Sequence, residues 1–354
     1  MAGKTNFKLL ILLASFCFSN STDAGSGTCA VGDEVCKEKA LLASILPKGA
    51  NTEGKPRAAV KACTDRHEQC KAFARNGECQ RNPGWMIINC GASCNNCHLR
   101  DPKIRCNRKA LNISTEPVYM PGDMSAMFND IERLYGDRYN VTVHSRAPWV
   151  VTFDDFMTPE ETTAIIGTVD KWERSTDTGS ANEFGEVGRV LSQGRTSSNA
   201  WCREACERNP HVQNVMKKIA EVTRVPTGHY ESFQILRYEP GQYYRSHHDY
   251  GPTQKALASG PRILTFFLYL SDVEEGGETS FTNLKMKIKP KRGRALLWPS
   301  TLDEEPEEQD WRTHHGAEPV IKGLKFAANA WIHLYDFRIP NLWGCTGTFD
   351  ELSD

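Results

Sequence analysis

The sequence predicts a mainly β fold with flanking helices, a double-stranded β-helix (jelly roll), joined to a small disulfide-rich module. Short strand-like runs separated by glycine- and proline-containing turns fill the C-terminal half of the chain. Helix-like segments precede them, and many short strands after helices are typical of two packed sheets with helical support. A cluster of six cysteines lies ahead of both.

The 354-residue chain opens with a segment typical of a secretory signal peptide. A basic start precedes an apolar run from Leu9 to Phe18, which small and polar residues follow through Ala24. We expect residues 1–24 to be cleaved off. An uncleaved anchor is the alternative, although a membrane span needs about 20 apolar residues. Residues 25–62 are expected to form a linker.

Net charge, hydropathy and cysteine content indicate which cellular compartment and which kinds of partner the chain is suited to. A formal charge of −1 gives no electrostatic case for a nucleic-acid partner, and no later segment is long and apolar enough to predict a stable membrane span. Thirteen cysteines become twelve once Cys17 is removed, an even number typical of oxidising compartments. The sequons Asn112-Ile113-Ser114 and Asn140-Val141-Thr142 agree with a glycoprotein of that compartment.

Six of the cysteines fall within 35 residues, too few for an apolar core, so disulfides must stabilise this module. A metal site using Cys94-x-x-Cys97 is disfavoured by the secretory context and by the lack of a second CxxC. The six are Cys63, Cys70, Cys79, Cys90, Cys94 and Cys97.

Asp65, Gly77 and the ending Cys90-Gly91-Ala92-Ser93-Cys94-Asn95-Asn96-Cys97 give residues 63–97 a resemblance to ShKT domains. The resemblance favours an accessory module that binds a protein partner, with channel blocking as the alternative. Spacing alone does not choose among fifteen pairings. The pairings that the resemblance implies are Cys63–Cys97, Cys70–Cys90 and Cys79–Cys94. Spacing leaves open the pairing of Cys29, Cys36, Cys106, Cys202, Cys206 and Cys345.

Helices are expected on both sides of residue 145. Residues 98–145 form a mixed connector, helical in apolar spacing over 124–135. Thr158-Pro159-Glu160-Glu161 combines a capping residue, a first-turn proline and acids, which predicts a helix from there to about Arg174. A second helix is expected over 210–224.

Strand-like runs rich in β-branched and aromatic residues follow, separated by turns such as Glu239-Pro240-Gly241-Gln242. The runs are Ser232–Tyr238, Tyr243–His248, Ile263–Leu270, Met286–Ile288, Ala295–Trp298 and Ala327–Tyr335.

His247, Asp249 and His315 form the pattern with the clearest chemistry. Residues two apart on a strand face the same side, so His247 and Asp249 can reach one metal while His248 points away. His315 must return by tertiary folding, and Lys325 follows it ten residues later. Two histidines and a carboxylate hold iron and leave three positions for a bidentate acid and dioxygen. The pattern therefore predicts an oxygenase site.

Four further motifs lie in the C-terminal half of the chain: Arg195-Thr196-Ser197-Ser198, the run from Gln234 to Tyr244, the run from Arg262 to Thr279 and the run from His315 to Lys325. In order and spacing they resemble the catalytic domain of prolyl 4-hydroxylases, especially the single-chain plant and algal type. We assign this domain to residues 146–340 and a C-terminal tail to 341–354.

The resemblance implies an Fe(II)- and 2-oxoglutarate-dependent dioxygenase that hydroxylates peptidyl proline, with O2 as cosubstrate, succinate as product and L-ascorbate keeping the iron reduced. It makes His247, Asp249 and His315 the metal ligands, and it pairs Lys325 with the distal carboxylate of 2-oxoglutarate. Lysine there favours the prolyl branch, since lysyl hydroxylases use arginine. Tyr238 and Thr279 match positions whose hydroxyls bind the same carboxylate.

The resemblance also implies a peptide-binding set, and it suggests a mobile loop over the cleft at Arg195. An extended proline-rich or collagen-like peptide offers few donors, so aromatic surface and arginine contacts suit its recognition. The peptide-binding residues are Glu231, Tyr244, Arg262 and His333, with Trp331 lining the cavity.

Two positions depart from the family pattern: Glu318 stands where relatives usually have cysteine, and His314 where they often have leucine. A dioxygenase for another residue such as lysine, and a non-catalytic binding protein acting through residues 63–97, are the alternative functions. The last six residues are not a KDEL-type signal, so the endoplasmic reticulum lumen is expected from the activity, with the Golgi or secretion as alternatives.

Overall fold

The structure is a computed structural model that describes residues 63–181 and 187–347. The predicted signal peptide (1–24), the predicted linker (25–62) with Cys29 and Cys36, and the end of the predicted tail lie outside these residues. Within the described ranges, no helix has the length and apolar character that crossing a bilayer requires.

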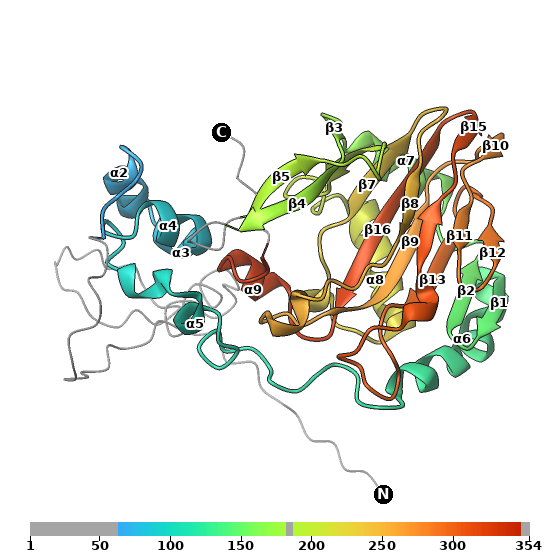
Figure 1. Ribbon diagram of the computed structural model, residues 1–354, viewed down its shortest axis with the longest axis horizontal. Helices are drawn as coiled ribbons and strands as arrows, with labels where there is room; N and C mark the ends of the chain where they lie inside the picture. Colours follow the sequence, from blue (N-terminus) through green and yellow to red (C-terminus); the bar gives the residue numbers. More distant parts are fainter. Residues whose placement is uncertain (1–62, 182–186, 348–354) are drawn as a thin grey trace, which may run out of the picture. The chain divides into compact units, whose positions relative to one another are not determined.

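Short helices and three disulfides make up the six-cysteine module (Figure 1). Its helices are α2 (Cys70–Arg75), α3 (Glu78–Arg81) and α4 (Pro83–Asn89). Asp65 fixes the final loop, because its carboxylate accepts hydrogen bonds from Ser93 N (3.0 Å) and Ser93 Oγ (2.6 Å). The disulfides, which are the pairings implied by the ShKT resemblance, are Cys63–Cys97, Cys70–Cys90 and Cys79–Cys94.

The segment after this module is bonded to the end of the chain. It contains η1 (Cys97–Arg100) and α5 (Pro102–Arg105), and α9 (Arg338–Leu342) lies near the C-terminus. Cys106 pairs with Cys345. Buried Arg105 donates to the carbonyls of Leu99 (2.8 Å) and Gly344 (3.3 Å). An apolar cluster joins the same segments through Ile87, Ile88, Leu99, Leu111, Ala258, Trp343 and Cys345.

An eight-stranded antiparallel sheet forms the centre of the remaining chain (Figure 1). Its order is β1 (Val141–Arg146), β2 (Trp149–Phe153), β13 (Ala295–Pro299), β9 (Arg262–Tyr269), β16 (Lys325–His333), β7 (Gln234–Tyr238), β6 (Ser198–Trp201) and β3 (Glu173–Arg174). A separate pair joins β4 (Thr176–Ala181) to β5 (Val187–Leu191).

A smaller four-stranded sheet packs on one face of the large one. Its order is β12 (Met286–Ile288), β11 (Thr279–Phe281), β14 (His315–Ala317) and β8 (Tyr244–His247), and β10 (Glu275–Gly276) pairs with β15 (Val320–Lys322). Phe281 and Ile288 of the small sheet share an apolar cluster with Phe267, Leu296 and Trp298 of the large sheet. Two packed antiparallel sheets confirm the predicted jelly roll.

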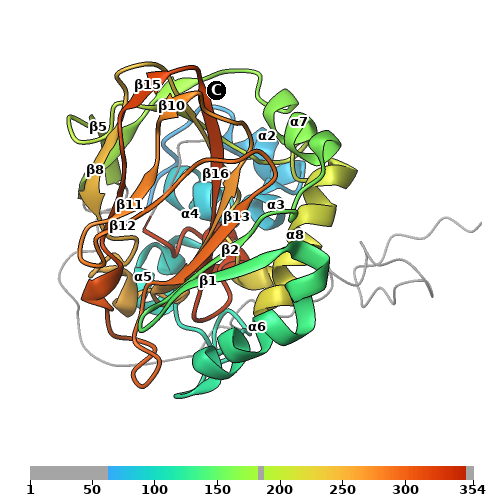
Figure 2. The same ribbon diagram turned by 90° about the vertical axis from the view of Figure 1, so that its right-hand side faces the viewer.

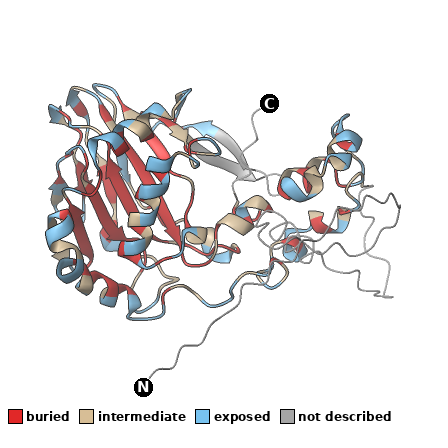
Figure 3. Cartoon of the chain, turned by 180° about the vertical axis from the view of Figure 1, so that it is seen from behind, coloured by how far each residue is buried: buried red, intermediate tan, exposed pale blue. Residues whose placement is uncertain are grey.

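Helices cover the other face of the large sheet (Figure 2). They are α6 (Asp123–Tyr139), α7 (Pro159–Gly167) and α8 (Pro210–Thr223). Alternation along β13 sends Ala295 and Leu297 to this helical core and Leu296 and Trp298 to the core between the sheets. The strands are accordingly buried, whereas the helices keep an exposed outer face (Figure 3). Both α6 and β1, within the predicted connector, contribute to this packing.

Most of the predicted helices and strands occur at the expected positions in the chain, but several begin or end at other residues. The helix expected to reach Arg174 ends at Gly167, which was wrong because Glu173–Arg174 pair with β6 as strand β3. The strands β1, β2, β6, β11, β14 and β15 were not expected. Short 3-10 turns complete the fold: η2 (Thr227–His229), η3 (Gln254–Ala256) and η4 (Trp311–Thr313).

Candidate active site

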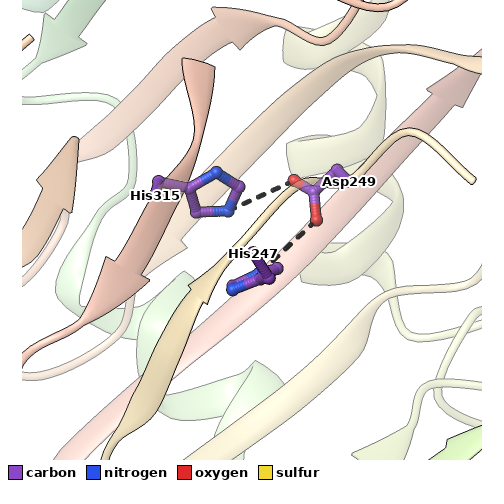
Figure 4. Close-up of side chains that lie close together, drawn as sticks. All are labelled: His247, Asp249 and His315. Carbon is purple, nitrogen blue, oxygen red and sulfur yellow. Dashed lines mark ion pairs between the residues drawn. The ribbon is translucent and has the colours of Figure 1, made fainter. Parts of the chain in front are cut away.

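Strand pairing brings His247, Asp249 and His315 together between the sheets (Figure 4). His247 ends β8 and His315 begins β14, and the two are opposite each other in the ladder. Nε2 of His247 lies 3.8 Å from Oδ1 of Asp249, and Nε2 of His315 lies 3.5 Å from Oδ2. One donor atom from each residue lies within 4.8 Å of the others, so a single metal ion can contact all three.

Backbone carbonyls fix which imidazole nitrogen faces the centre. Nδ1 of His247 is 2.9 Å from the Arg245 carbonyl, and Nδ1 of His315 is 3.0 Å from the Thr313 carbonyl. A carbonyl only accepts, so each Nδ1 carries a proton and each ring turns its Nε2 towards the centre. Burial and then the neighbouring His315 lower the pKa of His247 to about 3, which keeps its ring neutral.

Asp249 supplies the negative charge of the centre. Burial alone raises the pKa of its carboxyl, but His315, His247 and a 2.6 Å hydrogen bond from Thr265 Oγ1 outweigh burial and hold the pKa at about 2. Two imidazoles and one carboxylate are the donor set that suits ferrous iron with open coordination positions.

The adjacent histidine faces away, as expected. Nε2 of His248 lies 2.9 Å from the Asp310 carbonyl and 3.0 Å from Thr313 Oγ1. Its ring therefore bonds to the segment that precedes β14. Tyr244 stacks on His247 instead, with 3.6 Å between ring centroids and 18° between planes.

Lys325 lies completely buried at the start of β16, opposite Tyr238 in the ladder. Its Nζ donates to the Gly277 carbonyl (2.7 Å) and sits 5.2 Å from the ring centroid of Tyr238. No carboxylate oxygen of a described residue lies within 4.0 Å of this ammonium, and burial lowers its pKa to about 7 while Glu278 opposes that shift. A buried cation without an ion-pair partner suits an anionic ligand.

Hydroxyl groups line the same region. Thr279 Oγ1 and the Tyr269 hydroxyl are 2.6 Å apart, and the Tyr269 ring centroid lies 5.8 Å from Nζ of Lys325. Sequence reasoning identified Thr279 and Tyr238 but missed Tyr269. The sequence did carry a signal for Tyr269, namely the two-residue period of a strand. Phe267 and Tyr269 are two residues apart on β9, so both face the core between the sheets.

Four of the expected peptide-binding residues form one buried cluster. The Glu231 carboxylate accepts hydrogen bonds from Nε (2.5 Å) and Nη2 (3.0 Å) of Arg262, and it lies 2.8 Å from Nε2 of His333. Arg262 stacks over Trp331 with its Cζ 3.7 Å from the ring centroid. Burial raises the pKa of Glu231, but Arg262 and His333 outweigh it and lower the pKa to about 2.

Tyr244 lies apart from this cluster, against His247, and Arg195 lies near it with Cζ 4.8 Å from the Tyr244 ring centroid. Arg195 is buried and donates to Gln234 Oε1 (2.7 Å), and the mobile loop over the cleft at this residue stays a prediction. Glu318, which stands where relatives usually have cysteine, forms an ion pair with Lys287 (3.4 Å).

Comparisons with known proteins agree with this geometry. Residues 233–333 match the 2OG-Fe(II) oxygenase superfamily and residues 62–97 match the ShK domain-like family. Probable prolyl 4-hydroxylase 9 of Arabidopsis thaliana is 37% identical over 214 residues, which cover 55% of this chain and 72% of the relative. Prolyl 4-hydroxylase subunit alpha-1 of Gallus gallus is 30% identical over 201 residues, 54% of this chain and 37% of the relative.

Among solved structures, the 2-oxoglutarate complex of a viral collagen prolyl hydroxylase from Paramecium bursaria Chlorella virus 1 is 28% identical. The match covers 52% of this chain and 95% of that one, with a TM-score of 0.40.

Two packed sheets around two histidines and a carboxylate define an oxygenase dependent on Fe(II) and 2-oxoglutarate. Within that class, the chain belongs to the prolyl 4-hydroxylase family, and it is an enzyme of the procollagen-proline dioxygenase type that hydroxylates proline. The family implies Fe(II), 2-oxoglutarate and O2. The two imidazoles and the Asp249 carboxylate fit the metal, and the buried Lys325 ammonium fits the dicarboxylate.

Proposed function

We propose that this enzyme hydroxylates proline in proline-rich or collagen-like polypeptides within the secretory pathway, in the lumen of the endoplasmic reticulum, with L-ascorbate keeping its iron reduced. The five disulfides among the described residues support an oxidising compartment. The domain limits predicted from sequence are part of the proposal, with the ShKT module as an accessory partner-binding unit and with α6 and β1 supporting the catalytic sheet.

In this proposal His247, Asp249 and His315 hold the iron, and Lys325 binds the distal carboxylate of 2-oxoglutarate, assisted by the Tyr238 and Thr279 hydroxyls. The observation that carries it is the unpaired, fully buried ammonium of Lys325 in the same barrel as the three-donor centre. An ammonium buried without a counter-ion costs several kcal/mol, roughly, and a bound dicarboxylate removes much of that cost.

The metal and cosubstrate supply the oxidation when bound: O2 is consumed, 2-oxoglutarate becomes succinate and CO2, and one oxygen atom enters the C4–H bond of proline. The chain supplies orientation and a shielded cavity. The Arg245 and Thr313 carbonyls hold the histidine rings in their ligating tautomers, and Thr265 orients the Asp249 carboxylate.

On the peptide side, Arg262 is the residue best placed to bind a substrate carbonyl. Glu231 occupies its Nε and Nη2, which leaves Nη1 without a hydrogen bond to any described residue. Glu231 and His333 therefore orient Arg262, and Trp331 stacks beneath it. Tyr244 contributes from the metal side, where it packs on His247.

A turnover assay tests the proposal. Purified enzyme with Fe(II), ascorbate and 2-oxoglutarate is incubated with poly-proline and collagen-type peptides, and mass spectrometry locates the added oxygen. We expect 4-hydroxyproline and an equal amount of succinate. Replacing a residue that only orients a ligand lowers metal affinity or activity about 10- to 100-fold, so His247→Ala should lose more than about 100-fold.

His144→Ala is the matched control, because His144 bonds Thr152 on β1–β2 and lies outside the centre. Equal activity of His247→Ala and the parent enzyme would refute the metal assignment. Hydroxylysine without hydroxyproline in the products would replace proline by lysine as the target residue.

A further inference from the structure

Trp311 presents a large aromatic surface next to the proposed iron site. The residue is 66% exposed and is the only aromatic one among the exposed large hydrophobic residues of 63–181 and 187–347. Exposing so much aromatic surface forgoes burial that stabilises a fold, and such side chains are frequent where a protein binds a partner.

One face of the Trp311 ring packs against another aromatic side chain. It stacks on His314 with 5.1 Å between centroids and 10° between planes, so one face is covered. The Trp311 carbonyl accepts hydrogen bonds from Asn283 Nδ2 (2.6 Å) and His314 Nδ1 (3.0 Å). Asp310 caps the turn by accepting from Arg312 N (3.0 Å). A ring fixed in this way loses little conformational freedom when a ligand covers its other face.

The aromatic row continues from Trp311 and His314 to His248. His314 lies 5.0 Å from His248, centroid to centroid, and each is the sequence neighbour of a proposed iron ligand, His315 or His247. The row therefore lies on the outer face of the β8–β14 pair, whose inner face carries the two ligands.

We propose that Trp311, supported by His314, is a subsite that binds a proline ring of the substrate several residues away from the proline being hydroxylated. This inference rests on the proposed function. Proline-rich segments form a polyproline II helix without internal hydrogen bonds, and aromatic surfaces recognise them through ring-to-ring packing. Each residue advances that helix about 3.1 Å, so a longer peptide extends beyond the reaction site towards such a subsite, whereas a tripeptide extends much less.

Two peptides test the subsite: a proline-rich tripeptide and a proline-rich peptide of about twelve residues, each with one hydroxylation target. In the parent enzyme the longer peptide should have the larger kcat/KM. Trp311→Ala should lower the ratio of kcat/KM for long over short peptide about fivefold, the size expected for loss of one aromatic contact, through KM rather than kcat. Trp311→Tyr, which keeps an aromatic face, should restore most of that ratio.

Ile321→Ala is the matched control, since Ile321 is 61% exposed on β15 and has no place in this row. An unchanged ratio in Trp311→Ala, or an equal fall in Ile321→Ala, overturns the subsite. A parent enzyme that sediments as a dimer while Trp311→Ala sediments as a monomer also overturns it, because a second copy would then cover the ring.

Peptide binding gives a readout that does not depend on turnover. The long peptide should change the tryptophan fluorescence of the parent enzyme more than that of Trp311→Phe. If neither peptide is hydroxylated, the proposed function fails, yet this difference still tests the subsite. Equal fluorescence changes in both proteins contradict the subsite even when the parent enzyme is active.

Discussion

The proposed binding of 2-oxoglutarate by Lys325 predicts that cosubstrate binding depends on pH. Burial lowers the pKa of its ammonium to about 7, and only the protonated form attracts a carboxylate. Above pH 7 the free enzyme loses that proton, so binding must restore it, and KM for 2-oxoglutarate should rise with pH by up to about tenfold per unit. The measurement is KM for 2-oxoglutarate between pH 6.5 and 8.5 at saturating peptide.

Lys325→Arg is the control for this profile, because a guanidinium stays protonated throughout that range. Its KM should be higher than that of the parent enzyme at pH 6.5, owing to the larger group in a filled pocket, but nearly independent of pH. A parent profile as flat as that of the arginine variant would show that the Lys325 proton does not control binding.

Residue identities in the centre were predictable, whereas their supporting contacts were not. The spacing of His247 and Asp249 on a strand predicted a shared face, and family resemblance added His315 and Lys325. The carbonyls that orient both imidazoles, and the Thr265 hydroxyl on Asp249, come from backbone conformation and from another strand. No spacing rule in a single sequence encodes such contacts, so the hydrogen bonds that join Glu231, Arg262 and His333 emerged only from the fold.

Among the elements, helix starts were predicted better than strand limits. The Thr158-Pro159-Glu160-Glu161 signal is local, and the structure shows its full capping box. Strands of three or four residues, such as β11 and β14, carry too few residues to show alternation and are stabilised by their neighbours. The strand expected to begin at Ala327 begins at Lys325, whose buried side chain lies opposite Tyr238 in the ladder.

The α7 capping box permits a graded stability test. Thr158→Ala removes one capping hydrogen bond and should lower the free energy of unfolding by about 1 kcal/mol. Glu161→Ala should cost more, roughly 2 to 3 kcal/mol, because it also leaves half-buried Lys218 without its carboxylate partner at 2.8 Å, with only the Phe156 carbonyl to accept from it. Urea unfolding of both variants gives the comparison. Equal losses would mean that Glu161 acts only as a cap and that its pair with Lys218 adds nothing.

For the whole molecule, the Cys106–Cys345 disulfide closes the catalytic fold from its two ends. It spans 239 residues and lies beside the apolar cluster formed with Ile87 and Ile88 of the ShKT module. In the chain-entropy account, crosslinking so long a loop restricts the unfolded chain by roughly 5 kcal/mol, whereas a four-residue loop gives roughly 2 kcal/mol. The Cys202–Cys206 disulfide closes such a four-residue loop.

The two disulfides therefore form a matched pair for the last prediction. The double variant Cys106→Ser with Cys345→Ser should lose more unfolding free energy, by roughly 2 to 3 kcal/mol, than Cys202→Ser with Cys206→Ser. Urea unfolding under non-reducing conditions measures both. Cys202 and Cys345 are similarly buried, so the cost of placing a serine hydroxyl in each site is comparable and the difference reports loop length. A larger loss for the short loop would mean that local packing at Cys202 outweighs the restriction of the unfolded chain.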